Sequence, residues 1–138
     1  MSAQKKSKAQ PGKDKSVNRL IEKYQEILRT DPKNLKILSN LGAYYASLHK
    51  FDKAKEIFNK ILENDPKNLD GLNNIGVIYT QIGKLNNAIA KLEIAVKLKP
   101  DNPKYWNNLS EVYRRAGNYH KANVCRMRAI QITEKIEK

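Results

Sequence analysis

The sequence contains a single cysteine, Cys125, and no long run of apolar residues. One thiol cannot form a disulfide within the chain or a cysteine-based metal site, so the composition favours a reducing compartment. We interpret Cys125 as a small buried apolar residue. No stretch approaches the ~18 apolar residues of a membrane span, and the N-terminus lacks the apolar core of a signal peptide. We therefore expect a cytoplasmic protein that does not insert into a membrane.

Motifs that carry catalysis or hold cofactors are also missing. The sequence has no glycine-rich phosphate loop, no nucleophile motif and no spacing typical of metal ligands. The two histidines, His49 and His120, fall at turns in different parts of the chain. We therefore predict a protein that is not an enzyme and that holds no cofactor and no metal.

Acidic residues are scarce relative to basic ones. The chain has 27 Lys and Arg against 14 Asp and Glu, a formal net charge of +13. Such an excess favours acidic partners such as nucleic acid, anionic lipid or acidic peptides, although a lysine-rich soluble surface is the simpler explanation. Residues 1–15 are basic and show no apolar periodicity, so we expect a disordered basic tail there.

What the sequence does contain is a repeat of fixed period. The segment Asp31–Asn34 (Asp-Pro-Lys-Asn) recurs as Asp65–Asn68, which sets the period at 65 − 31 = 34, and Tyr45, Tyr79 and Tyr113 keep the same step. A fixed period in this range indicates stacked helical units rather than one globular core. That architecture favours a binding surface over a catalytic pocket.

Each unit holds two amphipathic helical patterns, in which apolar residues recur at steps of three and four. The break between the two patterns falls at Gly83 in the second unit and at Gly117 in the third. Glycine can adopt the left-handed conformation that ends a helix without steric cost. His49 occupies the matching place in the first unit, which predicts a strained turn or a turn of another type.

Small residues in the helices indicate close packing within a unit. Gly42 and Gly76 lie in the middle of helical patterns, where glycine costs ~1 kcal/mol relative to alanine. We interpret them as points where two helices approach closely, with Ala54, Ala88 and Ala122 forming the small face opposite.

The repeat also extends backward, because Val17, Leu20, Tyr24 and Ile27 stand one period before apolar positions of the first unit. We therefore predict a half-repeat helix at 16–33. Three full repeats follow at 34–68, 69–102 and 103–138, which gives seven helices in all.

The last helix departs from the apolar pattern at two positions. Asn123 and Arg126 stand where other units have apolar residues. This predicts that the third repeat forms its own polar cap where stacking stops. The alternative is an anion site formed by Arg126 and Arg128.

The positions of Trp106, Leu109, Tyr113, Gly117 and Ala122 resemble the pattern of the tetratricopeptide repeat, and the other two units match it at corresponding positions. The resemblance covers about residues 34–138. It implies an all-α, right-handed superhelix with a concave groove lined by the first helix of each unit. It also implies a non-catalytic scaffold for protein–protein interaction that binds a peptide, which the charge suggests is acidic.

Asparagines form a column in this implied groove, because Asn40, Asn74 and Asn108 stand one period apart. An asparagine amide both donates and accepts, so the column can hold the backbone of an extended peptide. The alternative, of equal weight, is that these asparagines bond within the scaffold. The candidate groove residues are Asn40, Asn73, Asn74, Val77, Lys104, Asn107, Asn108, Glu111, Arg114 and Arg115.

One known subclass of the family grips the C-terminal carboxylates of heat-shock chaperones with a set of Lys, Arg and Asn residues. This sequence keeps Asn74 and Lys104 of that set. It has Ser39, Ala43 and Asn108 where the clamp has Lys, Asn and Arg. We therefore predict that the chain has no such carboxylate clamp.

Two other functions remain as alternatives. A basic solenoid can bind nucleic acid or another polyanion, but Trp106 and Tyr113 fall at positions that pack inward, and no nucleic-acid-binding motif is visible. The chain could also self-associate through its end helices, and the sequence does not determine its oligomeric state.

Overall fold

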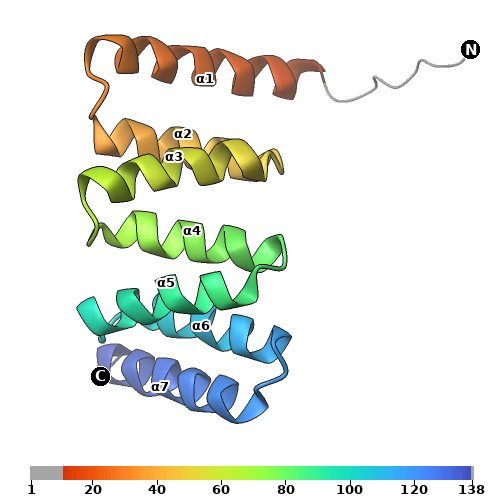
Figure 1. Cartoon of the computed structure of the whole chain (residues 1–138), viewed down its shortest axis with the longest axis vertical. Helices are drawn as coiled ribbons and strands as arrows, with labels where there is room; N and C mark the ends of the chain where they lie inside the picture. The colour runs from red at the N-terminus through yellow and green to blue at the C-terminus, as the bar shows by residue number, and fades with distance from the viewer. Residues whose placement is uncertain (1–10, 138) are drawn as a thin grey trace, which may run out of the picture.

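The computed structural model describes residues 11–137, which form seven helices stacked in chain order (Figure 1). The helices are α1 (Pro11–Thr30), α2 (Leu35–Ser47), α3 (Phe51–Asn64), α4 (Leu69–Gln81), α5 (Leu85–Leu98), α6 (Pro103–Arg115) and α7 (Tyr119–Glu137). Each repeat unit supplies one helix pair, and α1 is the half-repeat that precedes the three pairs. The predicted all-α repeat architecture is confirmed.

The asparagine immediately before the first helix of each unit caps that helix. The side-chain oxygens of Asn34, Asn68 and Asn102 accept hydrogen bonds of 2.8–3.1 Å from backbone N–H groups in the first turns of α2, α4 and α6. Such a cap satisfies one of the N–H groups that every helix start leaves unpaired. These caps start the three helices at equivalent residues, so equivalent side chains stay in register along the stack.

The turn inside each unit has the same backbone form in all three repeats. Gly83 and Gly117 have φ of +84°, and His49 has φ of +58°. In each repeat the residue after this position donates its N–H to the carbonyl of the repeat tyrosine, for example Lys50 to Tyr45 at 2.9 Å. The first turn is therefore the strained version of a shared turn, which confirms the first of the two predicted outcomes.

The mid-helix glycines do mark close approaches. A Cβ atom built on Gly42 would lie 2.8 Å from the ring of Phe58, and one on Gly76 would lie 2.6 Å from Cγ of Leu92. The glycines therefore make room for a large apolar side chain of the paired helix, which the sequence did not predict. Ala54, one turn before Phe58 on that helix, is fully buried.

The third repeat replaces both members of this close contact. Ser110 stands where Gly42 and Gly76 stand, and exposed Arg126 stands where the other repeats have a large apolar side chain. The hydroxyl of Ser110 donates to the carbonyl of Ala122 at 2.7 Å. Once the large side chain opposite is gone, a serine fits at this position.

The first helix begins earlier than the predicted boundary at residue 16. Helix α1 starts at Pro11, and proline is well suited to a first helical position because its φ is already helical. The predicted disorder over residues 1–10 lies outside the described residues. Among residues 15–30 of α1, Ile21 is the only buried side chain, and Val17, Tyr24 and Leu28 are partly buried against the first repeat.

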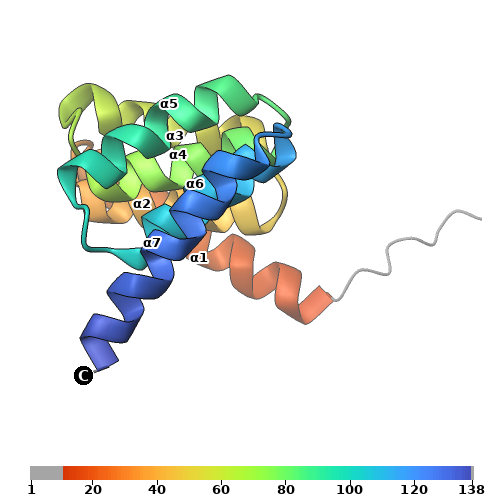
Figure 2. The same ribbon diagram turned by 90° about the horizontal axis from the view of Figure 1, so that it is seen from below.

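Viewed along the stack, the helices form two layers (Figure 2). Helix α4 contacts both α2 and α6 directly. These three are the first helices of the repeats, and together they form what we call the inner face. Helices α3 and α5 lie on the other side, and the core between the layers includes the fully buried side chains Phe58, Ile75 and Leu92. The end helices α1 and α7 are longer than the others, and in Figure 2 both project beyond the inner layer.

The outer surface of α7 is more apolar than the predicted polar cap. Asn123 and Arg126 are exposed, as expected, but Val124, Met127 and Ile130 are exposed beside them. The sequence predicted the two polar residues but not the exposed apolar residues beside them. The end of the stack is therefore of mixed polarity.

Candidate functional site

Four rows of equivalent side chains run across the inner face. Every member of these rows is exposed or half-buried, and the members of a row stand one repeat period apart on α2, α4 and α6. We call these twelve residues the inner stripe. Its rows are Lys36, Asp70 and Lys104; Asn40, Asn74 and Asn108; Ala43, Val77 and Glu111; and Ser47, Gln81 and Arg115.

The asparagine row shows two kinds of hydrogen bonding. Asn74 donates to the backbone carbonyl of Asp70 at 2.8 Å, one turn back in the same helix. Asn108 donates to the side-chain oxygen of Asn73 at 2.7 Å, which links α6 to α4. An amide has two N–H donors and an acceptor oxygen, so one internal bond leaves capacity for a ligand. Asn74 and Asn108 thus bond within the scaffold, and binding of a ligand by the column stays a prediction.

Asn73 differs from the other candidate groove residues, because it is only 3% exposed. Its buried side chain accepts the hydrogen bond from Asn108 and is not presented to a ligand. The predicted neighbour of the column is thus a support for the column, and we leave it out of the binding surface proposed below.

The charged end of the inner stripe is an ion-pair cluster on α6. Glu111 accepts hydrogen bonds from Arg114 at 2.7 Å and Arg115 at 2.8 Å. These bonds lower the pKa of Glu111 below its usual range. Arg115 also donates to the backbone carbonyl of Thr80 on α4 at 3.3 Å. The sequence placed these three charged residues in one groove, but it did not predict that one carboxylate holds both guanidinium groups.

The remaining candidates are Lys104 and Val77, which belong to the inner stripe, and Asn107, which does not. Lys104 is exposed at the start of α6, and Val77 is half-buried in the row that contains Glu111. Asn107 lines a small pocket of about 160 Å³ with Ile130 and Thr133 of α7. Asn107 therefore faces the last helix of the stack.

The three aromatic residues of α6 differ in burial. Tyr105 and Tyr113 are buried at 6% exposure, whereas Trp106 is half-exposed. The indole N–H of Trp106 donates to the carbonyl of Pro100 at 2.8 Å, and the guanidinium of Arg128 lies 5.9 Å from its ring centre. Trp106 packs against the core as predicted, but it is only partly buried.

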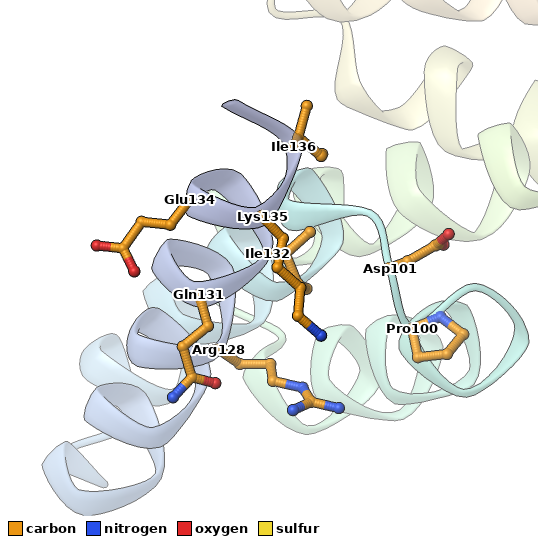
Figure 3. A pocket seen from close by; sticks show the side chains of 8 residues that line it. All are labelled: Pro100, Asp101, Arg128, Gln131, Ile132, Glu134, Lys135 and Ile136. Carbon is orange, nitrogen blue, oxygen red and sulfur yellow. The ribbon is translucent and has the colours of Figure 1, made fainter. Parts of the chain in front are cut away.

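A shallow cleft of about 580 Å³ opens between the last turns of α7 and the loop from α5 to α6 (Figure 3). In Figure 3, Arg128 and Lys135 extend from α7 toward the loop at Pro100, while Glu134 points away from it. The cleft exists because α7 continues past the end of its contact with α6. Sequence analysis could not find it, because the repeat pattern carries no information on how far the last helix extends.

Two further observations concern the described part of the chain. Between residues 11 and 137, no helix is long and apolar enough to cross a bilayer. In the same range, no three His, Cys, Asp or Glu side chains gather closely enough to hold a metal ion.

Comparison with known proteins identifies the repeat. Family profiles described as tetratricopeptide repeat match residues 35–68, 57–90 and 103–136, and one described as TPR repeat matches residues 76–117. No protein of curated function matches the sequence.

Solved structures of MamA proteins share the fold. MamA AMB-1 is 27% identical, with a TM-score of 0.77 over 89% of this chain and 73% of that one. MamA MSR-1 is 26% identical, with a TM-score of 0.75 over 89% and 71%. MamA from Desulfovibrio magneticus RS-1 has a TM-score of 0.82 over 92% and 72%, and at 16% identity it shows the fold alone.

Proposed function

Because the chain belongs to the tetratricopeptide repeat family, we propose that it is a non-catalytic scaffold whose inner stripe binds an extended segment of a partner protein. The repeats and the MamA-like neighbours support a protein-interaction scaffold. A cytoplasmic location remains a prediction from the single cysteine.

The observation that carries the proposal is the register of the inner stripe. Helices in direct contact lie about 8–10 Å apart, so α2 and α6 are separated by about 16–20 Å. An extended chain rises about 3.3 Å per residue and covers that distance in about five or six residues. A bound segment of this length would meet one asparagine on each of three helices, which suits recognition of a repeating backbone.

Hydrogen bonding by the asparagine row gives only weak binding. Each net hydrogen bond contributes about 1 kcal/mol, and micromolar affinity needs about 8 kcal/mol. The row therefore positions a peptide, and neighbouring side chains must supply the rest of the affinity and the specificity. Val77 offers an apolar contact beside Asn74.

Charge gives the proposed segment a direction. Lys104, Arg114 and Arg115 stand on α6 against Glu111, while α2 presents the small side chains Ala43 and Ser47. An acidic residue near one end of the segment would pair with the cations of α6. The other end would cross the small residues of α2, where a bulky side chain has room.

Substitution of the central asparagine tests this proposal. A peptide selected from a random display library on the full chain is titrated calorimetrically into the wild type and Asn74→Ala. We expect about a fivefold loss of affinity, which corresponds to one hydrogen bond of about 1 kcal/mol. Asn86→Ala, at an exposed site on α5, is the matched control and should bind as the wild type does.

Two results would contradict the proposal. One is an unchanged affinity in Asn74→Ala with unchanged helicity by circular dichroism. The other is competition of a random oligonucleotide for the same surface with a steep salt dependence, which would favour the polyanion-binding alternative.

A further inference from the structure

A second groove, of about 680 Å³, lies between α5 and α7. Its floor includes Trp106, Leu109 and Tyr113 of α6. At about 100° per residue these three positions lie on the side of α6 opposite Asn108 and Glu111. The groove is therefore separate from the inner stripe, and the function proposed above does not use it.

A short side chain lies at the base of this groove. Cys125 lines it where the first repeat has buried Ile57 and the second has Lys91, two periods and one period earlier. Both of those side chains are larger than cysteine. Cys125 is therefore the smallest of the three side chains at this repeat position.

The walls of the groove are basic. Lys97 on α5 stands one period after Glu63, and Lys121 on α7 stands where the second repeat has Asn87 and the first repeat has Lys53. Both lysines are exposed and line the groove, and Lys121 lies 5.5 Å from the ring centre of Tyr113. Arg128 adds a third cation beside Trp106, and Figure 3 shows it extending toward Pro100, which also lines the groove.

The single carboxylate in the groove is already engaged. Glu93 accepts a hydrogen bond of 2.5 Å from the hydroxyl of Tyr113. Burial, and then this carboxylate, raise the pKa of Tyr113 well above its usual range, so the hydroxyl keeps its proton and remains the donor. Two lysines line the groove against one engaged carboxylate, and Arg128 lies beside Trp106, so positive charge is in excess around an apolar floor.

We propose that this groove binds a second segment of a partner protein, a short acidic segment that carries one or two bulky apolar side chains. The apolar side chain lies between Val96 and Val124 above the α6 floor, and flanking carboxylates pair with Lys97 and Lys121. A second copy of this chain fits poorly, because its net charge is +13.

The one tryptophan of the chain makes the groove directly observable, since Trp106 lines it. The probe is the end-blocked peptide Asp-Glu-Phe-Leu-Glu-Asp, titrated into the full chain while Trp106 fluorescence is followed. We expect saturable binding to the wild type, to Cys125→Ser, which preserves the size of the side chain, and to Asn74→Ala, which alters only the inner stripe. A peptide with serines in place of Phe-Leu should bind at least tenfold more weakly.

Two variants distinguish specific binding in this groove from nonspecific binding. Cys125→Ile restores the residue of the first repeat, fills the base and should weaken binding at least tenfold while the helicity remains. Lys97→Glu with Lys121→Asn replaces both lysines by the residues that stand one period earlier, Glu63 and Asn87, and should also weaken binding about tenfold. The test therefore survives if Cys125→Ile does not fold. Wild-type affinity in the folded variants would overturn the proposal, as would equal binding of the serine peptide or a fluorescence change with anionic phosphatidylserine vesicles alone. Weakening by Asn74→Ala would assign the peptide to the inner stripe instead.

Discussion

His49 holds the left-handed backbone conformation that glycine holds at the same place in the other two repeats. For a residue with a side chain this conformation costs roughly 1–2 kcal/mol, which the surrounding helix pair must offset. Part of that cost is balanced by contact with the ring of Phe51, whose centre lies 5.5 Å from that of His49. The sequence was sufficient to identify this strain, because the repeat aligns His49 with two glycines.

We predict that His49→Gly stabilises the fold by about 1 kcal/mol, because glycine adopts this conformation without steric cost. Urea unfolding followed by circular dichroism measures the change. Gly83→Ala, at the equivalent position of the second repeat, is the opposite substitution and should lower stability by a similar amount. A less stable His49→Gly variant would mean that the contact with Phe51 outweighs the strain.

The close contact between Gly76 and Leu92 gives a second prediction at this scale. A methyl group on Gly76 would meet Leu92 Cγ at 2.6 Å, so overpacking of about 1–3 kcal/mol should exceed the gain of about 1 kcal/mol in helix propensity. Gly76→Ala should therefore destabilise the wild type but stabilise a Leu92→Ala background. Thermal unfolding of the four proteins in this cycle measures the coupling, and equal effects of Gly76→Ala in both backgrounds would refute the contact.

At the scale of elements, periodicity predicted which segments are helices and how they pair, because each helix buries one face at a step of three or four residues. It predicted the side-chain partners less well. The bonds from Asn108 to Asn73 and from Arg115 to the carbonyl of Thr80 join different repeats. The apolar pattern within one repeat does not predict contacts between repeats. For the same reason it does not predict the groove around Cys125.

The two end helices should differ from the middle of the stack in local stability, and α1 shows this most clearly. Helix α1 packs against the first repeat, and over residues 15–30 it buries only Ile21, whereas α4 contacts α2, α3, α5 and α6. Elements with few buried contacts open at lower free energy. We expect the backbone amides of α1 to exchange with deuterium at least tenfold faster than those of α4, as measured by mass spectrometry. Equal protection of the two helices would show that α1 belongs to the same cooperative unit.

At the scale of the whole molecule, the stack presents two surfaces of different chemistry. The inner stripe is polar and regular, with a charge cluster at one end, while the groove between α5 and α7 is apolar and basic. Both surfaces include residues of the third repeat, whose sequence departs most from the other two repeats. A scaffold with two such surfaces can hold two segments of one partner or of two partners at once.

The central claim is that an extended peptide crosses the inner stripe, and chemical-shift mapping tests it most directly. A display-selected peptide is titrated into the ¹⁵N-labelled chain, and backbone and side-chain amide resonances are followed. The account predicts that the side-chain amides of Asn40 and Asn74 and the exposed positions of α2, α4 and α6 shift together with one affinity. Shifts confined to α1, or to α5 and α7, while both asparagine amides stay in place would contradict it.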